Sequence, residues 1–467
     1  MTDSAMALLL RINDPGALRE ERIEALKTHE AAERQKNPIP LSGAGDSDAA
    51  ETPLREVNNH IHTIYSFSPY TPAMAALRCL EAGLGAAGSV DHDSIAAAEE
   101  MIEACAVLGI GGCSGFEVRV SFKTGADGRP GLFAGRKINN PDSAGIVYMT
   151  VQGVPKPAIP RTAEFLRPLR EERLLRTRAM AENANIVLRE SGLGEIDFDR
   201  DIRGRSQFDR GGGITERHLL AAVAEVFIKK YGKGPDLVSA LEGRLGVKAP
   251  PKIAAMLSDR ENIHYLYDLL GILKSTFLPC IFIQPGEREC LPARQVTAFA
   301  NDIGAVPSYA YLGDVGESPT GDKKAEHFED AFLEPLFEEL ARLGYRAVTY
   351  MPPRNTEEQL RRVRQLCAEW GFMEISGVDI NSSRQSFNSP EVLLPPFRHL
   401  IDTTWALIAH ERLSSLDKSL GLFAPDNPLA TESLEKRLAV YADVGRSPGL
   451  RDEASYYTIM KNLKTGK

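Results

Sequence analysis

Two histidines separated by one residue, His60 and His62, lie in a run over 57–62 whose residue types are typical of a strand. Side chains alternate along a strand, so both imidazoles should point to the same side. Two imidazoles on one face at the end of a strand can hold a first-row transition metal. Such pairs also occur as ordinary buried or surface histidines. The interpretation therefore depends on the polar residues farther along the chain.

Further polar or metal-capable residues follow four later strand-like runs. Asp91-His92-Asp93 follows 85–90, Glu117 follows 110–116, Tyr311 follows 305–310, and Asp379 follows 372–378. Helical patterns separate these runs, for example over 71–82 and 94–108, and this alternation predicts a parallel sheet with crossover helices. The carboxyl ends of strands in a parallel barrel open onto one face, so these side chains are expected to meet there. Mixed imidazole and carboxylate ligands suit Zn, Mn or Fe better than Mg or Ca.

The chain divides into five predicted parts: a helical arm and linker (1–54), a first barrel part (55–155), a mostly helical insertion (156–294), a second barrel part (295–396) and a helical C-terminal extension (397–467). The arm carries a predicted helix over 15–35 and a Pro/Gly/Ser/Asp-rich linker over 38–53, and we expect it to dock outside the main fold. In the insertion, Gly211-Gly212-Gly213 precedes a helix but follows no strand. It therefore fits neither a P-loop nor a dinucleotide fingerprint, and we interpret it as a hinge or flexible cap.

Composition narrows the classes of function. The net charge of −9 gives no general basic footprint for nucleic acid, so a nuclease-like module is disfavoured and no nucleic-acid partner is expected. The six cysteines include no Cys-x-x-Cys pair, which is typical of reduced thiols in a cytoplasmic protein. We recognise neither a signal peptide nor an apolar span of membrane length, so no membrane association is expected. The oligomeric state stays open.

Six stretches, taken together, resemble the polymerase and histidinol phosphatase (PHP) family of metal-dependent phosphoesterases: NNHIHTIYSFSP, SVDHDS, GFEVR, AVPSYAYLG, VTYMPPRNTEEQ and ISGVDIN. They occur in the family's order over 55–155 and 295–385, and ITERHLLAAV in the insertion is similar to the helical lid segment of small-molecule members. The resemblance implies an α/β fold, a distorted (β/α)₇ PHP-type barrel. It also implies release of phosphate from nucleotides or sugar-like phosphates, with three metals held by nine ligands.

The same resemblance implies metal-ligand roles for four residues: His60, His62, Glu117 and Asp379. It also places His92 at another metal. Four other positions depart from the family pattern: Phe67 stands for an acidic residue, and Tyr148 or Gln152, Tyr311 and Asn381 each stand for a histidine. Phenylalanine cannot bind a metal, and tyrosine or asparagine replaces imidazole poorly. We therefore expect about one divalent transition metal per chain.

The function expected from these residues is metal-dependent hydrolysis of a small phosphoester such as a nucleotide or sugar phosphate. The candidate catalytic residues are His92 as proton donor to the leaving group, Arg384 as a fork on the phosphate, and Tyr311 as a hydrogen-bond donor. The candidate substrate-binding residues are Arg217, His218 and Asn381. For each of these residues, a purely structural or solvated role is the alternative.

A second hypothesis is not an enzyme. Because two of the three family metal sites lack ligands, the chain could be a catalytically degenerate PHP-like protein that binds a metal or small ligand in a sensing or scaffold role. Metal content measured together with a broad phosphatase screen separates the two hypotheses.

Overall fold

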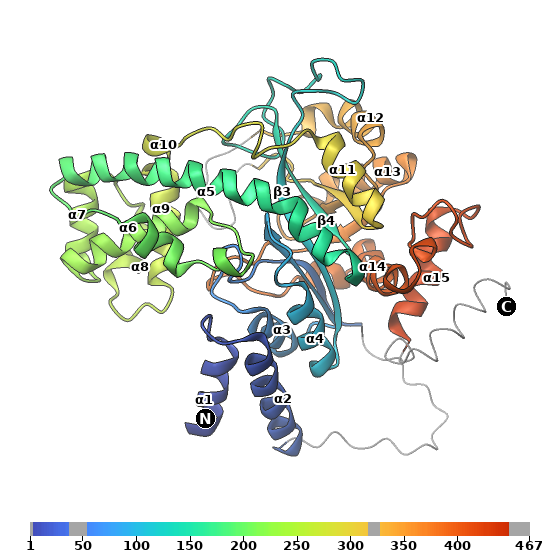
Figure 1. Ribbon diagram of the computed structural model, residues 1–467, viewed down its shortest axis with the longest axis horizontal. Coiled ribbons are helices and arrows are strands. Elements are labelled where there is room, and N and C mark those ends of the chain that lie inside the picture. Colours follow the sequence, from blue (N-terminus) through green and yellow to red (C-terminus); the bar gives the residue numbers. More distant parts are fainter. Residues whose placement is uncertain (1–2, 37–53, 316–326, 448–467) are drawn as a thin grey trace.

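A computed structural model describes residues 3–36, 54–315 and 327–447, and these build a nearly closed seven-stranded barrel with helical extensions (Figure 1). Strand order in the sheet follows the chain: β1 (Val57–Ile61), β2 (Ala86–His92), β3 (Gly111–Ser121), β4 (Ile146–Gln152), β5 (Val306–Ala310), β6 (Ala347–Tyr350) and β7 (Met373–Ser376). This is the distorted (β/α)₇-like architecture that the sequence predicts.

The segment after β7 returns to β1 and almost closes the ring. The amide of Ile380 donates to the carbonyl of His60 (3.0 Å), and the amide of His62 donates to the carbonyl of Ile380 (2.9 Å). A Cβ on Gly377 would lie 2.6 Å from the Cβ of His60, so only glycine lets the two backbones approach this closely. Asp379 is thereby brought beside the two histidines of β1.

The expectation of a wholly parallel sheet is wrong at β4. This strand pairs antiparallel with both β3 and β5, whereas all other neighbouring strands pair in parallel. Residues 122–145 between β3 and β4 contain no helix, and a chain without a crossover element can only turn back against the strand it has left. β3 is also longer than predicted, so Glu117 lies within the strand and not after its end.

Helices cover the outside of the barrel: α3 (Pro72–Glu81), α4 (Ala98–Leu108), α11 (Ala293–Ile303), α12 (Leu333–Leu343), α13 (Glu357–Trp370) and α14 (His399–Leu416), with α15 (Leu434–Arg446) against α14. Thr71 caps α3 by accepting from the amide of Met74. The helix predicted from Ser94 begins later, at Ala98. Residues 448–467 of the predicted C-terminal extension lie outside the described residues.

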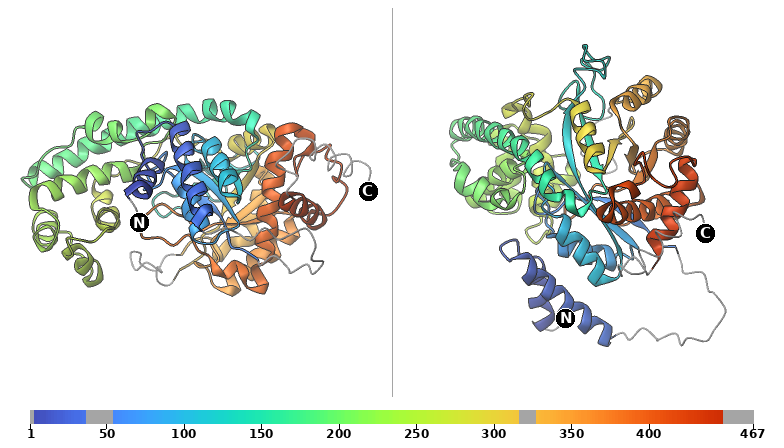
Figure 2. Two further views of the ribbon diagram at one scale, coloured as in Figure 1. Left: turned by 90° about the horizontal axis from the view of Figure 1, so that it is seen from below. Right: turned by 45° about the vertical axis from the view of Figure 1, so that its right-hand side comes forward.

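The N-terminal arm consists of two helices, where the sequence predicted one. α1 (Asp3–Ile12) and α2 (Arg19–Lys36) pack against α3 and α4, outside the barrel (Figure 2). Arg22 of α2 makes a buried two-point contact with Glu100 of α4, at 2.9 and 2.5 Å. A charge pair shielded from water in this way fixes the arm to the barrel. The predicted linker over 38–53 lies outside the described residues.

The helical insertion, defined here as α5 to α10, forms a separate body beside the barrel (Figure 1). Its helices are α5 (Ile159–Glu190), α6 (Glu216–Tyr231), α7 (Pro235–Leu245), α8 (Pro251–Ser258), α9 (Tyr265–Thr276) and the short α10 (Leu278–Ile281). Apolar side chains such as Leu219, Phe227 and Leu269 give it a hydrophobic core of its own. Among the described residues, no helix is both long enough and apolar enough to cross a membrane.

Candidate metal centre

The imidazoles of His60, on β1, and of His62, which directly follows β1, lie beside each other, as their spacing predicts. His60 is 7% exposed and His62 is 1% exposed, and their ring centres lie 5.2 Å apart. Glu117 reaches both imidazoles from β3, with one carboxylate oxygen 3.6 Å from Nε2 of His60 and the other 3.8 Å from Nε2 of His62. Each of these three residues offers a ligand atom within 4.8 Å of the other two.

Two further residues of the predicted set border this trio. Oδ1 of Asp379, in the segment after β7, lies 3.4 Å from Nε2 of His62. Nδ1 of His92, at the end of β2, lies 2.8 Å from Oε2 of Glu117, and its ring centre is 4.5 Å from that of His62. The structure therefore brings all five residues together. Asp379 reaches the trio only through His62.

A chain of hydrogen bonds sets the tautomer of His62. The Ser66 hydroxyl donates its proton to Oδ1 of Asp91 (2.6 Å), so its oxygen must accept from Nδ1 of His62 (3.1 Å). The proton of His62 therefore sits on Nδ1, and Nε2 carries a lone pair. That Nε2 is buried and has no hydrogen-bond partner in the described structure. An unpartnered imidazole nitrogen facing two carboxylates suits a metal cation.

The protonation states also fit ligand roles. Burial lowers the pKa of His62 and of His92 to about 3, so both imidazoles are neutral near pH 7. Burial raises the pKa of Glu117. Burial opposes ionisation of Asp379 as well, but the His62 and His60 imidazoles and the Arg217 guanidinium outweigh it and lower the pKa of Asp379 to about 2. Neutral imidazoles and ionised carboxylates are the forms that bind metals.

The same electrostatics bear on the role predicted for His92. A neutral ring that donates Nδ1–H to Glu117 has Nε2 free to accept a proton and holds no spare proton for a leaving group. In addition to burial, the nearby Arg173 lowers the pKa of His92. The geometry therefore favours a proton-accepting or water-orienting role.

Two of the predicted substrate-binding residues connect the helical insertion to Asp379. Arg217, on α6, donates from Nη1 to the side-chain oxygen (2.5 Å) and the carbonyl (2.8 Å) of Asn381. Asn381 in turn donates from Nδ2 to Oδ1 of Asp379 (2.6 Å). Through Asn381, the insertion thus reaches Asp379 of the candidate metal centre.

His218 and Phe67 form an aromatic contact between the insertion and the loop after β1. Nδ1 of His218 accepts from the amide of Thr215 and caps α6, so this nitrogen is unavailable to a substrate. The Phe67 ring meets the His218 ring edge-on at 4.9 Å and lies 6.1 Å from the Tyr267 ring. Phe67 also holds a positive φ of 75°, which is strained for a bulky residue.

Two predicted catalytic residues are engaged elsewhere. Arg384 forms a two-point ion pair with Asp268 of α9, with both contacts at 2.6 Å. The Tyr311 hydroxyl donates to Oδ1 of Asp330 at 2.6 Å. These contacts give both side chains structural partners and direct neither toward His62. Of the two residues standing for a family histidine on β4, the Tyr148 ring lies 6.1 Å from the His92 ring, whereas the Gln152 amide donates to Thr150.

Sequence reasoning missed a buried cluster of ion pairs beside His92. It joins three arginines to three carboxylates across the barrel and the insertion: Arg119, Arg173 and Arg176 with Asp93, Glu216 and Glu289. Arg173 contacts Asp93 at 2.7 Å and Glu216 at 2.6 Å. The one signal in the sequence was spacing: Arg119 follows Glu117 by two residues on a strand and therefore shares its face.

Comparisons with known proteins leave the family open. No family model matches the chain, and no curated protein matches its sequence. Among the solved structures that are similar to it are the following two, each at 17% sequence identity. One, from Bifidobacterium adolescentis, is described as a metal-dependent phosphoesterase; 73% of this chain and 96% of that chain are covered, with a TM-score of 0.44. The other is an amidohydrolase from Chromobacterium violaceum, with 74% and 95% covered and a TM-score of 0.46. At these scores neither similarity indicates what this chain binds or hydrolyses.

Proposed function

We propose that this protein is a metal-dependent hydrolase of a small phosphoester, with one divalent transition metal held by His60, His62 and Glu117 and completed by Asp379. The observation that carries the proposal is Nε2 of His62. It is buried without a hydrogen-bond partner, 3.8 Å from Glu117 and 3.4 Å from Asp379. Two imidazoles with one or two carboxylates favour Zn, Mn or Fe.

When bound, such an ion supplies Lewis-acid chemistry, which lowers the pKa of water and polarises a phosphoryl oxygen. The protein's own groups supply position and proton handling. His92 accepts or orients a proton at Nε2, because its Nδ1 is held by Glu117. Asn381 holds Asp379 in place, and Arg217 of α6 brings a positive charge to the edge of the site.

A phosphoester is favoured over other hydrolysable groups for two reasons. The six PHP-like stretches carry the residues of this site in order, and Arg217 is suited to an anionic substrate. The proposed substrate is a nucleotide or sugar phosphate, and the proposed location is the cytoplasm, where all six cysteines would remain free, as they are in the structure. Arg384 and Tyr311 are left out of the reaction because Asp268 and Asp330 hold them.

Elemental analysis of protein purified without chelator, combined with a screen of phosphomonoesters, tests the proposal. We expect about one transition metal per chain and turnover that disappears in His62→Ala. Stoichiometric metal without turnover of any phosphoester would overturn the hydrolase assignment. Absence of bound metal in a folded preparation, after incubation with Zn, Mn and Fe, would overturn the metal centre itself.

One observation favours a second candidate, a PHP-like protein that binds a metal or small ligand without turnover. Phe67 stands where the PHP-like pattern has an acidic residue and packs on His218 and Tyr267, so this position supplies no ligand for a second metal. The same two measurements distinguish the candidates, because the second predicts metal or ligand binding with no product in the phosphoester screen.

A further inference from the structure

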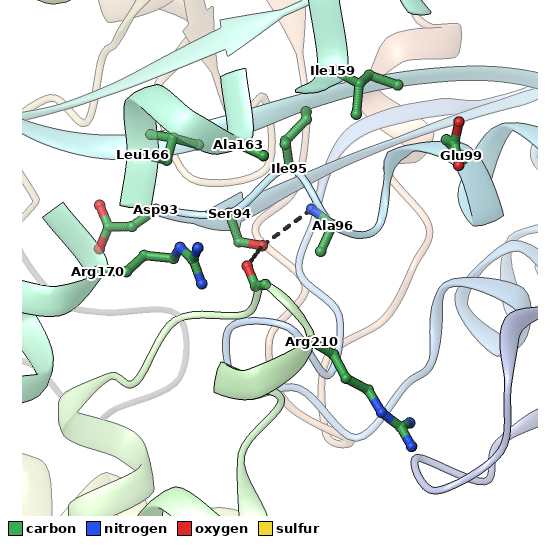
Figure 3. Close-up of a pocket in the computed structure, with 11 residues that line it drawn as sticks. Asp93, Ser94, Ile95, Ala96, Glu99, Ile159, Ala163, Leu166, Arg170 and Arg210 are labelled. Carbon is green, nitrogen blue, oxygen red and sulfur yellow. Dashed lines mark hydrogen bonds between the residues drawn. The ribbon is translucent and has the colours of Figure 1, made fainter. Parts of the chain in front are cut away.

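A pocket of about 180 Å³ lies between the barrel and the helical insertion (Figure 3). Its walls come from the turn after β2, from the first half of α5, and from the segment that ends at Gly211. It opens beside Asp93, which follows His92 in the chain. His60, His62 and Glu117 are not among its lining residues, so it is a different cavity from the candidate metal centre.

One side of this pocket is apolar. Ile95, Ile159, Ala163 and Leu166 contribute alkyl groups, and Ile95 and Leu166 are otherwise buried. The β2–α4 turn supplies Ile95, and the other three lie on successive turns of α5. A short hydrocarbon chain bound here would remove itself and the exposed parts of Ile159 and Ala163 from water, which is favourable for every methylene buried.

The charged side chains of the lining, with one exception, are satisfied by partners outside the pocket. Asp93 pairs with Arg173 (2.7 Å), Glu99 pairs with Arg19 (2.6 Å), and Arg210 donates to the carbonyls of Pro15 (3.0 Å) and Gly16 (3.1 Å). In Figure 3 the Arg210 side chain accordingly extends away from the rest of the lining. Each of the two carboxylates therefore already has an arginine partner.

The exception is Arg170. Its guanidinium donates to the carbonyl of Gly212 (3.2 Å) and lies over the Phe208 ring (5.7 Å), and in Figure 3 it points toward Ser94. Among the described residues, no carboxylate lies within 4.0 Å of it. Burial is the largest influence on the pKa of Arg170 and lowers it, whereas the charges of Asp93 and Glu171 act in the opposite direction. A half-buried guanidinium that has no ion-pair partner within 4.0 Å can bind an oxyanion.

We propose that this pocket binds an oxyanion, phosphate or carboxylate, that carries a short alkyl chain. The oxyanion sits on the Arg170 guanidinium, and the chain packs against Ile95, Ile159 and Leu166. The site requires no metal and is independent of the proposed hydrolase activity.

A ligand bound in this pocket would contact the glycine segment 211–213, which packs on His92 of the candidate metal centre. The Ser94 hydroxyl donates to the carbonyl of Gly211 (2.7 Å), and the amide of Gly213 donates to the carbonyl of Tyr65 (2.7 Å). A Cβ on Gly213 would lie 2.8 Å from the carbonyl oxygen of His92, so this glycine segment rests directly on the His92 backbone. A ligand held by Arg170 therefore contacts the same segment that packs on His92.

Calorimetric titration of the full chain with butylphosphonate and with pentanoate tests the proposal, with inorganic phosphate as the probe that lacks an alkyl chain. Butylphosphonate is not hydrolysed, so binding is separated from turnover. The variants are Arg170→Gln, which removes the charge, and Ala163→Leu, which fills the pocket. The matched control is Arg167→Gln, one turn earlier on α5, where the arginine is exposed and pairs with Glu164 and Glu171. His62→Ala tests independence from the metal centre.

We expect saturable binding of one alkyl oxyanion per chain, weakened about tenfold or more by Arg170→Gln and by Ala163→Leu and unchanged by Arg167→Gln and His62→Ala. The stronger of the two alkyl probes identifies the oxyanion, and inorganic phosphate should bind several-fold more weakly. Binding that survives both pocket variants, or that His62→Ala abolishes, overturns the proposal, as does the absence of saturable binding. Should Arg170→Gln fail to fold, Arg170→Lys and Ala163→Leu decide it.

Discussion

Nδ2 of Asn381 donates to Oδ1 of Asp379 at 2.6 Å, and this same carboxylate oxygen faces Nε2 of His62 at 3.4 Å. The amide therefore fixes which way Asp379 points. Because Asn381 is itself held by Arg217, a residue of the helical insertion helps to position a candidate metal ligand on the barrel. Groups behind a ligand are known to change metal affinity by about tenfold to a hundredfold.

Replacing Asn381 by Ala should weaken metal binding by about tenfold, because Asp379 loses the donor that orients it. The measurement is competition with a chelator of known affinity. Equal metal affinity of Asn381→Ala and wild type would show that Asn381 does not orient Asp379 for metal binding.

Arg217→Ala should lower kcat/KM on an identified substrate by about tenfold to a hundredfold and leave metal content at saturating metal unchanged.

Removal of His62 and removal of His92 should have different effects on the amount of bound metal. His62→Ala should abolish tight metal binding, since its Nε2 faces both carboxylates, whereas His92→Ala should retain most of the metal, since the carboxylate that His92 pairs with is Glu117 alone among the described residues. Elemental analysis of both variants, with circular dichroism to verify folding, measures the difference. Metal loss in His92→Ala equal to that in His62→Ala would make His92 a direct ligand.

Many of the strands and helices could be predicted from local residue patterns in the sequence. The seven strands lie close to the strand-like runs, and α3 begins at the predicted Thr71-Pro72 start. The orientation of β4 could not be predicted, because the residue types of Ile146–Gln152 suit a parallel strand as well as an antiparallel one. The two orientations are distinguished by whether residues 122–145 contain a crossover helix. The sequence of that stretch has no pattern strong enough to exclude such a helix.

In the metal centre too, relations between residues close in sequence could be predicted, whereas contacts between residues far apart in sequence could not. His60 and His62 could be paired from spacing alone, because a strand alternates its side chains. By contrast, Arg384 was a candidate because it follows Asp379 by five residues, and Tyr311 because it follows a strand and stands for a histidine of the PHP-like pattern. Their actual partners, Asp268 and Asp330, are 116 and 19 residues away in the chain. The ion pair of Arg384 with Asp268 depends on how the insertion folds, which no short motif encodes.

The buried arginine–glutamate cluster should make a large contribution to stability. Glu289→Ala removes a buried partner that Arg119 and Arg176 share, leaves them with Glu216, and should lower the free energy of unfolding by about 3–5 kcal/mol. Asp199→Ala, which removes the exposed partner of Arg178 on α5, is the control and should change the free energy of unfolding far less. Urea unfolding measures both. Similar values for the two variants would show that the cluster stabilises no more than a surface pair.

Glu411 should make stability depend on pH. Burial raises the pKa of this carboxyl from 4.5 to about 8, although Ser114 donates to it from its amide at 2.7 Å. The folded state therefore holds a proton that the unfolded chain releases, so the free energy of unfolding falls as pH rises from 4.5 toward 8 and levels off above that.

The Glu411→Gln variant isolates this contribution. It should lose the slope in that pH range and exceed wild type in stability at the alkaline end by on the order of 3–5 kcal/mol. The exposed Glu369→Gln, measured alongside by urea unfolding, should keep the slope of wild type. A slope retained in Glu411→Gln would assign the pH dependence to other groups.

Phe67 offers a way to restore a second metal. Its φ of 75° lies where aspartate is tolerated better than phenylalanine, so Phe67→Asp should relieve backbone strain while supplying a carboxylate. The variant also loses the ring contacts with His218 and Tyr267, and Phe67→Ala measures that loss by itself. Combined with Asn381→His, Phe67→Asp should raise the metal stoichiometry above that of wild type, because it supplies the carboxylate and imidazole that the PHP pattern places with His92. Elemental analysis of the folded double variant is the measurement. If the stoichiometry stays at the wild-type value, these two positions do not border a vacated metal site.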